Sequence, residues 1–316
     1  MNGRNCWKNS IRNTMDSILI VGTGALACLF AARLAAQGVQ VTMLGTWREG
    51  LAALRMYGVT IVQEDGKQTS YPVRVVDQTD TCIGSKYALV LVKSWQTQRA
   101  ARQMADCLDS DGVALTLQNG LGNYETLSEE LGEDRVALGV TTTGATLLSS
   151  GRVRPGGEGT VSLGPHPHLD PIIDLLRLGG FNLEIHQDLQ ALIWGKLVVN
   201  AAINPLTALL QMPNGEIISR PSARQLSADL AREVAAVAAA QNIQLPHLDP
   251  IQVSEGVAER TATNHSSMYQ DILRGAPTEI DAICGAVVQM GTRLGIPTPV
   301  NYAMWKLIHA VVEGIQ

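Results

Sequence analysis

One lysine and two asparagines recur at four-residue intervals in an otherwise apolar stretch. Lys196, Asn200 and Asn204 lie between Trp194 and Pro205, and the residues among them are nearly all Leu, Val, Ile or Ala. On an α-helix a step of four residues rotates by only about 40°, so the three polar groups would share one stripe. A buried lysine with no carboxylate three or four residues away needs a partner from elsewhere. The stretch therefore predicts a site where a lysine meets an anion, a carbonyl or a distant carboxylate.

The chemistry that suits such a lysine is proton donation. Burial lowers the pKa of a lysine towards the working pH, so Lys196 could stabilise and protonate a developing alkoxide. Asn200 and Asn204 could bind hydroxyl and carboxylate groups without adding a buried charge. The residues alone leave plainer alternatives open. Lys196 could extend to solvent at a helix edge, and the asparagines could join helices, with Asn204 capping a break before Pro205.

A glycine-rich turn near the N-terminus defines a second candidate site. A β-branched run at 17–21 leads directly into Gly22-Thr23-Gly24-Ala25-Leu26-Ala27. An alanine-rich helical segment at 28–37 and a second strand at 39–44 follow. This order is typical of a βαβ unit of about 30 residues with the G-x-G-x-x-A pattern. The context favours dinucleotide binding over an ordinary glycine turn.

Each small residue of this turn has a physical role in holding a pyrophosphate. Gly22 permits the tight turn, Gly24 lets the phosphates approach the backbone, and Ala27 lets helix and strand pack closely. The helix N-terminus offers unpaired N–H groups and the positive end of its dipole. The sequence therefore predicts that residues 22–27 hold a dinucleotide.

The end of the second predicted strand bears on which dinucleotide binds. Enzymes that use NAD usually carry an acid there, which holds the ribose 2′-hydroxyl. This chain has Thr46 and Arg48 instead, and a guanidinium can pair with a 2′-phosphate. The alternative is a surface arginine paired with Glu49. We favour NADP(H).

Polar side chains follow two further predicted strands. The strand at 87–92 ends at Lys93, and the strand at 113–117 is followed by Asn119. Ligands of open α/β sheets bind beyond the carboxyl ends of the strands, so we expect both residues near cofactor or substrate. A simple Asn119-Gly120 turn is the alternative.

Composition excludes several classes of function. The chain has 316 residues and a net charge of -5, with no basic run, which argues against nucleic-acid binding. It has no stretch of about 18 continuous apolar residues, so we expect no membrane span. Its five cysteines are scattered without CxxC spacing, which predicts reduced thiols in a cytoplasmic protein. We expect no metal site, because nothing completes a ligand set around His166 and His168.

Element patterns divide the chain into two parts after a polar leader. Residues 1–16 are expected to be disordered, and Met15 could be the true start. Strands and helices alternate over 17–187, where 151–164 is expected to add two short antiparallel strands that close the sheet. Strand patterns then vanish over 188–316, and helices are predicted at 189–204, 222–241, 251–265, 279–294 and 301–314. We therefore predict an α/β Rossmann-type dinucleotide-binding domain followed by an all-α C-terminal domain. Lys196 should face the cleft between them, and a homodimer stays open.

With these residues in place, the chain resembles the ketopantoate reductase family from Ser17 to Gln316. The resemblance rests on several motifs in the family's order, namely GTGALA (22–27), VKSWQT (92–97), QNGLGN (118–123), WGKLVVNAAINPLTAL (194–209), PNGE (213–216) and SSMYQDI…TEID (266–281). It implies reduction of 2-dehydropantoate to (R)-pantoate with NADPH, in pantothenate and coenzyme A biosynthesis.

The resemblance also implies residue roles. Lys196 would be the general acid and Glu279 the carboxylate that holds it. The groups that grip the substrate would be Asn119, Asn200, Asn204, Asn214 and Ser267. Cofactor contacts would come from residues 22–27, Thr46, Arg48, Lys93, Asn119 and Glu279. The family usually has arginine where Thr46 stands, so Arg48 would replace it. From the residues alone, Glu279 could instead favour a helix N-terminus through Thr278-x-x-Asp281.

Two competing functions remain. A reductase of the same fold could act on another 2-keto acid, because pocket residues set that choice. A non-catalytic NADP(H)-binding sensor is disfavoured, since a sensor has no need of a buried proton donor such as Lys196.

Overall fold

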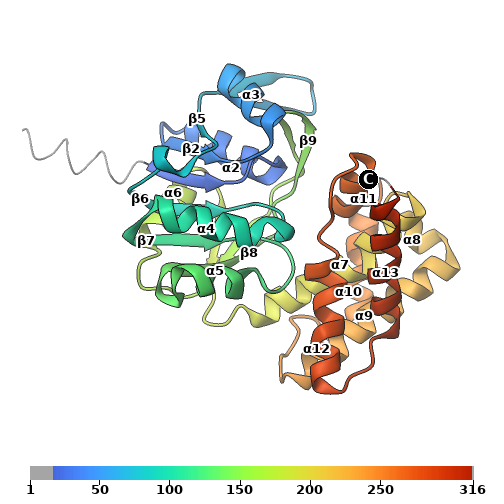
Figure 1. The fold of residues 1–316 in the computed structure, drawn as a ribbon. Coiled ribbons are helices and arrows are strands. Elements are labelled where there is room, and N and C mark those ends of the chain that lie inside the picture. The colour runs from blue at the N-terminus through green and yellow to red at the C-terminus, as the bar shows by residue number, and fades with distance from the viewer. Residues whose placement is uncertain (1–16, 315–316) are drawn as a thin grey trace, which may run out of the picture. The chain divides into compact units, whose positions relative to one another are not determined.

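The computed structural model describes residues 17–314, which divide into two compact units (Figure 1). The first unit comprises residues 17–92, 96–118 and 124–189, and the second comprises 93–95, 119–123 and 190–314. The predicted leader and the question of Met15 lie outside the described residues.

The first unit is built on an eight-stranded sheet. Its strand order is β12(Asn182–Ile185)-β11(Thr160–Leu163)-β8(Val136–Thr141)-β7(Leu108–Thr116)-β6(Ser85–Val90)-β1(Ser17–Val21)-β2(Gln40–Leu44)-β5(Arg74–Val76). All neighbouring strands are parallel except β11 and β8, which are antiparallel. The predicted Rossmann-type sheet is confirmed.

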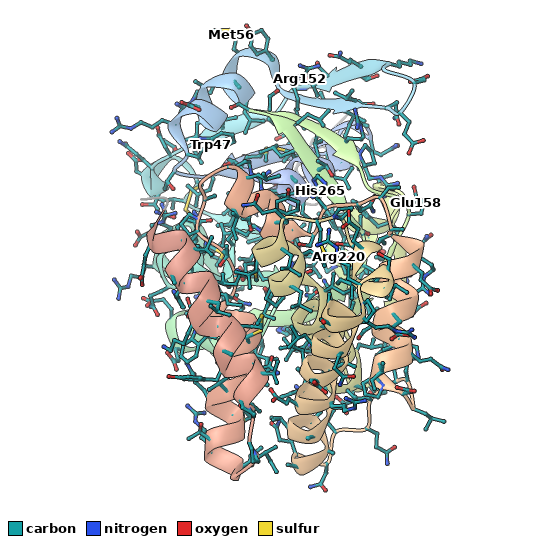
Figure 2. All side chains as sticks on the ribbon, turned by 90° about the vertical axis from the view of Figure 1, so that its right-hand side faces the viewer. Trp47, Met56, Arg152, Glu158, Arg220 and His265 are labelled. Atoms are coloured by element: carbon teal, nitrogen blue, oxygen red, sulfur yellow. A yellow bond between two sulfur atoms is a disulfide. The ribbon has the colours of Figure 1, made fainter. Side chains whose placement is uncertain are left out.

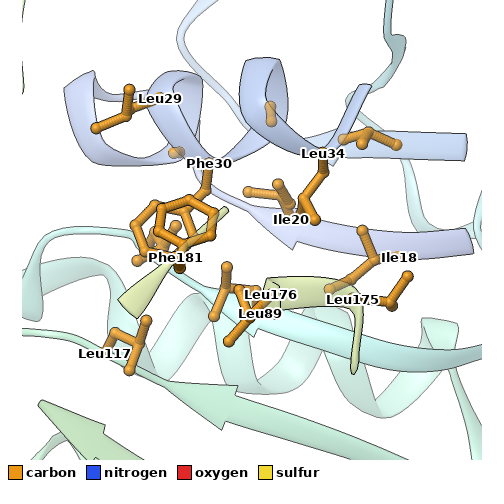
Figure 3. Close-up of a cluster of buried hydrophobic side chains, with 14 of the residues drawn as sticks. Ile18, Ile20, Leu29, Phe30, Leu34, Leu89, Leu117, Leu175, Leu176 and Phe181 are labelled. Carbon is orange, nitrogen blue, oxygen red and sulfur yellow. The ribbon is translucent and has the colours of Figure 1, made fainter. Parts of the chain in front are cut away.

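Strand β1 is apolar from Ile18 to Val21 because both faces of the sheet are covered by helices. Ile18 and Ile20 join one core with α2 (Ala25–Ala35) and α6 (Asp170–Leu178). In the same core the rings of Phe30 and Phe181 stack with centroids 4.0 Å apart (Figure 3). The alternate residues of β1, Leu19 and Val21, join a second core with α4 (Thr97–Cys107) and α5 (Asn123–Leu131).

A second, four-stranded sheet corrects the expectation for residues 151–164. Its order is β4(Gln68–Tyr71)-β3(Val59–Val62)-β10(Arg152–Pro155)-β9(Ala145–Ser149). Strand β10 therefore lies in this sheet and β11 in the large one, so the two do not pair. The chain turns away at Gly156, whose N–H donates to the Gly144 carbonyl at 2.8 Å. A helix that the sequence reading missed, α3 (Arg48–Tyr57), precedes β3.

The expectation of reduced cysteines throughout is also corrected. Cys82 and Cys107 form a disulfide, with their Cα atoms 5.1 Å apart. Cys82 follows a 3₁₀ turn at Thr79–Thr81, and Cys107 is the last residue of α4. The fold therefore joins two cysteines that are 25 positions apart. Sequence spacing alone carries no information on such a contact. Cys28 and Cys284 are free and buried, and Cys6 lies outside the described residues.

The second unit is all-helical, as predicted. Its core surrounds α7 (Gln190–Leu210), against which α9 (Pro221–Ala240), α10 (Pro250–Arg260), α11 (Ser267–Leu273) and α13 (Pro299–Glu313) pack. Short α8 (Glu216–Ser219), a π-helical turn η4 (Asp281–Gly285) and α12 (Ala286–Leu294) complete it.

Helix α7 continues through Pro205, so the break expected after Asn204 is wrong. Every residue from 201 to 208 is buried, and this packing compensates for the hydrogen bond that proline cannot donate. The Thr207 hydroxyl also donates to the carbonyls of Ile203 and Asn204 at 3.0 and 3.2 Å. Of the described helices, α7 alone is long and apolar enough to cross a membrane, but most of it is buried, as in a core helix.

Candidate active site

The glycine turn of the first unit has the backbone that its sequence predicts. Gly22 has a φ of +131°, and its N–H donates to the Leu44 carbonyl at 2.8 Å. A Cβ at this position would lie 3.0 Å from the carbonyl carbon and oxygen of Leu91. The turn therefore requires glycine for both its conformation and its space.

The start of α2 offers free backbone donors. Gly24 precedes the helix and makes no side-chain capping bond, so the first N–H groups, from Ala25 onward, keep no partner within the helix. A Cβ built on Gly24 meets nothing within 4 Å, which leaves open space in front of these donors. Ala27 is fully buried against the sheet. The residues of this turn fit the pyrophosphate of a dinucleotide.

Thr23 packs against Gly45, a residue that the sequence analysis did not predict to be part of the site. Its side chain is buried, and its methyl carbon lies only 2.6 Å from where a Cβ on Gly45 would be. Gly45 therefore lets the end of β2 pack against the glycine turn. The signal was a glycine directly after a strand, which usually marks a close approach of backbone.

The end of β2 presents exposed polar groups. Thr46 and Arg48 are both exposed, and Arg48 is the first residue of α3 rather than part of the strand end. Trp47 between them is 39% exposed (Figure 2). Its ring lies 2.2 Å from where a Cβ on Gly50 would be. No acid occupies this strand end, in keeping with the sequence.

The second unit gathers two lysines and two carboxylates. The Lys93 ammonium donates to Asp271 Oδ2 at 2.7 Å and to Glu279 Oε2 at 3.4 Å. Both carboxylates are almost fully buried, with side chains 3% and 5% exposed. Asp271 is a second site residue that the sequence reading missed. Its only signal was a helical spacing of four from Ser267.

Glu279 connects the two loops that follow β6 and β7. Its Oε1 accepts the backbone N–H of Ser94 at 3.2 Å, and its Oε2 accepts the Asn119 amide at 3.5 Å. The π-turn η4 that follows receives no side-chain capping bond. The carboxylate therefore binds the strand-end loops and makes no side-chain capping bond to η4.

The loop at Asn119 is fixed against the same π-turn. The Leu121 N–H donates to the Ala282 carbonyl at 2.9 Å, and Asn119 accepts a bond from the Asn123 amide at 2.9 Å. A Cβ on Gly120 would lie 2.5 Å from the Ala282 oxygen, so glycine allows this close approach. Asn119 and Glu279 are thus held together by backbone contacts as well as by their side chains.

The two lysines differ in their proton affinity. Desolvation lowers the pKa of Lys196 on α7 to about 8, against the opposing negative charge of Glu279. Desolvation also lowers the pKa of Lys93, but the charges of Glu279 and Asp271 and the hydrogen bonds to both outweigh it and raise the net value. Lys93 therefore stays charged, whereas Lys196 can exchange a proton near neutral pH.

The remaining predicted residues of the second unit are placed as follows. Asn200 and Asn204 share α7 with Lys196 at successive steps of four residues. Asn214 is buried, its amide nitrogen donates to Thr261 at 2.9 Å, and its Oδ1 has no hydrogen-bond partner among the described residues. Ser267 is exposed at the start of α11.

Within residues 17–314, no three His, Cys, Asp or Glu side chains are grouped so that they could hold a metal ion. His166 instead contacts the Asp134 carbonyl through Nε2 at 3.0 Å, and His168 lies beside it in an edge-to-face arrangement. Desolvation lowers the pKa of His166.

Comparison with known proteins assigns both units to one family. Residues 18–168 match the model "Ketopantoate reductase PanE/ApbA", and residues 188–312 match "Ketopantoate reductase PanE/ApbA C terminal". The chain is 34% identical over 309 residues to the 2-dehydropantoate 2-reductase of Archaeoglobus fulgidus, covering 95% of this chain and 99% of the relative. It is 32% identical to that of Vibrio cholerae, covering 94% and 98%.

Solved structures resemble both units. A ketopantoate reductase from Ralstonia eutropha JMP134 matches with a TM-score of 0.88 and 29% identity, covering 95% of this chain and 99% of that one. A ternary structure of D-mandelate dehydrogenase with NADH and anilino(oxo)acetate matches with a TM-score of 0.87 and 25% identity over the same shares.

Proposed function

Because the chain belongs to the ketopantoate reductase family and is an oxidoreductase, we propose that it reduces 2-dehydropantoate to (R)-pantoate with NADPH, in pantothenate and coenzyme A biosynthesis in the cytoplasm. The relatives from Archaeoglobus fulgidus and Vibrio cholerae are named 2-dehydropantoate 2-reductases. The observation that carries the mechanism is the lowered pKa of Lys196, which lies on the same helix as two asparagines and feels the charge of Glu279.

Cofactor binding is the part that residues 22–27 and the end of β2 would serve. NADPH, when bound, supplies the hydride for the ketone carbon. The open donors at the start of α2 would hold its pyrophosphate, and Arg48 with the Thr46 hydroxyl would hold the 2′-phosphate. Arg48 supports this role because it is exposed and no acid stands at the strand end to favour an unphosphorylated ribose.

Lys196 would donate its Nζ proton to the ketone oxygen as negative charge develops there. A pKa of about 8 keeps the ammonium mostly protonated at neutral pH while making it a far better acid than an ordinary lysine. Glu279 would hold this ammonium charged before the transfer and stabilise its orientation. Lys93, which stays charged and is paired with Asp271 and Glu279, would lie between cofactor and substrate.

Amide and hydroxyl groups would recognise the rest of the keto acid. Asn200 and Asn204 would present donors along the stripe of Lys196, and Ser267 would add a hydroxyl. Asn214 supports a role in binding because its buried Oδ1 is an unused acceptor that a substrate hydroxyl could fill. Asn119 would lie between cofactor and substrate, since its amide binds Glu279.

The test is a reductase assay on the purified protein. NADPH or NADH is mixed with a panel of 2-keto acids that includes 2-dehydropantoate, and the nicotinamide absorbance is followed. We expect 2-dehydropantoate with NADPH to give the highest kcat/KM. If none of the keto acids in the panel is reduced, the enzyme hypothesis is overturned in favour of a nucleotide sensor. Faster turnover with NADH would overturn the role given to Arg48.

A second substrate class is supported by the D-mandelate dehydrogenase likeness. That structure holds NADH and anilino(oxo)acetate on the same fold. The panel should therefore include aryl 2-keto acids such as benzoylformate. A higher kcat/KM for an aryl acid than for 2-dehydropantoate would replace the first assignment, and sedimentation of the same sample would decide whether a homodimer forms.

A further inference from the structure

Lys93 has two carboxylate partners, and the closer one is not Glu279. Its ammonium lies 2.7 Å from Asp271 Oδ2 and 3.4 Å from Glu279 Oε2. A charge-assisted hydrogen bond is strongest near the shorter of these distances. Asp271 is therefore the closer hydrogen-bond partner of Lys93, although the charge of Glu279 raises the pKa of Lys93 more than the charge of Asp271 does.

Asp271 is built to hold cations rather than to touch solvent. Its side chain is 3% exposed, Oδ2 binds Lys93, and Oδ1 accepts from Arg274 at 2.9 Å. Desolvation raises the pKa of Asp271, and the charges of Lys93 and Arg274 act against that shift. A buried carboxylate whose oxygens bind two cations is a fixed structural charge.

Glu279 by contrast accepts longer hydrogen bonds, from several donors. It accepts from Lys93, from the Ser94 N–H and from Asn119 at 3.2 to 3.5 Å, and its charge also raises the proton affinity of Lys196. A second ammonium drawn fully onto Glu279 would compete with Lys196 for that charge.

We propose that Asp271 is a positioning residue that binds Lys93 and so reserves the charge of Glu279 for the general acid Lys196. The inference deepens the proposed function and rests on it for the role of Lys196. The cluster carries two carboxylates for the two inner lysines, with Arg274 at the rim of Asp271. Without the Asp271 charge, Lys93 and Lys196 would both depend on Glu279, and Lys196 would lose its proton at lower pH.

The charged groups around this cluster come from four segments. Lys93 belongs to the loop after β6, Lys196 to α7, Asp271 and Arg274 to α11 and its end, and Glu279 to the segment before η4. Arg274 offers a matched control, because it binds the other oxygen of the same carboxylate and is 41% exposed.

The experiment measures the proton affinity of Lys196 without a substrate. The protein is treated with an amine-acylating reagent over a range of pH, and mass spectrometry follows the labelling rate of Lys196, because only the neutral amine reacts. In Asp271→Asn we expect the labelling midpoint to fall by about one pH unit. Arg274→Ala should leave it unchanged. The same shift should appear in the high-pH limb of kcat/KM for keto acid reduction.

A double variant tests whether Asp271 acts through Lys93. In a Lys93→Met background the competing ammonium is gone, so adding Asp271→Asn should no longer move the Lys196 midpoint. This double variant also removes the half-buried lysine that Asp271→Asn would leave with Glu279 as its remaining carboxylate partner, so it serves if Asp271→Asn alone fails to fold. An equal midpoint in wild type and Asp271→Asn, or an equal effect of Asp271→Asn in both backgrounds, would overturn the proposal. Wild-type protein that reduces no keto acid yet shows the predicted labelling shifts would overturn the proposed function alone.

Discussion

Replacing Lys196 with methionine should remove the general acid while keeping the volume of the side chain. General acid catalysis is typically worth about 10²–10⁴-fold, which corresponds to roughly 3–5 kcal/mol of barrier. We therefore expect kcat to fall by that factor while the melting temperature changes little, because methionine suits the apolar flanks of α7. A pKa of about 8 also fixes the shape of the wild-type profile. Roughly nine-tenths of Lys196 is protonated at pH 7 and about one-tenth at pH 9.

The assay is kcat and kcat/KM between pH 6 and 10 for the wild type and Lys196→Met. Wild-type kcat/KM should fall about tenfold per pH unit above pH 8, since the acid is lost as pH rises through its folded-state pKa. The variant should show a flat profile over this range. Lys86→Met is the control, because Lys86 forms an exposed ion pair with Asp111 at 3.3 Å and should affect neither profile. A variant that retains both the wild-type kcat and its high-pH limb would refute the assignment of the acid.

Three further outcomes follow from the same geometry. Glu279→Gln removes the charge that raises the pKa of Lys196, so the high-pH limb of kcat/KM should move to lower pH; an unmoved limb would show that another group supports the lysine. Gly22→Ala should abolish NADPH binding, measured by fluorescence titration, and destabilise the fold by about 1–3 kcal/mol, because its φ of +131° and the 3.0 Å contact admit no Cβ. Arg48→Ala should raise the KM for NADPH at least tenfold and leave that for NADH within about twofold; equal changes in both would place Arg48 away from the 2′-phosphate.

The sequence predicted those parts of the fold that depend on local pattern. Successive residues of β1 are buried on opposite faces of the sheet, so the strand appears in the sequence as an apolar run. The positive φ of Gly22 requires glycine in the turn that follows. Together these two local patterns predicted the Rossmann-type unit. Two features escaped because they depend on distant packing. Pro205 remains inside α7 because surrounding helices bury that turn. Strand β10 joins a second sheet because of a partner more than 80 residues earlier, β3.

The candidate site was predictable in its residue types but not in its pairings. Lys93, Asn119 and Lys196 stood out because polar groups at strand ends or in apolar helices need a reason. Which carboxylate lies closer to Lys93 is decided by distances of 2.7 and 3.4 Å, and no spacing rule resolves that difference. Asp271 therefore looked like an ordinary helix residue.

The strand-end loops explain why this pairing matters for catalysis. Residues 93–95 and 119–123 follow strands of the large sheet, yet their contacts place them in the helical unit with Glu279. The carboxylates and both lysines thus belong to a single unit, where Asp271 and Glu279 bind Lys93 and the charge of Glu279 acts on Lys196 without a cofactor. Electrostatic preorganisation of this kind costs nothing at the moment of reaction. It follows that the proton affinity of Lys196 is set before NADPH binds, so its labelling midpoint should lie near pH 8 in the cofactor-free protein. A midpoint near that of an ordinary lysine in the absence of cofactor would contradict this view.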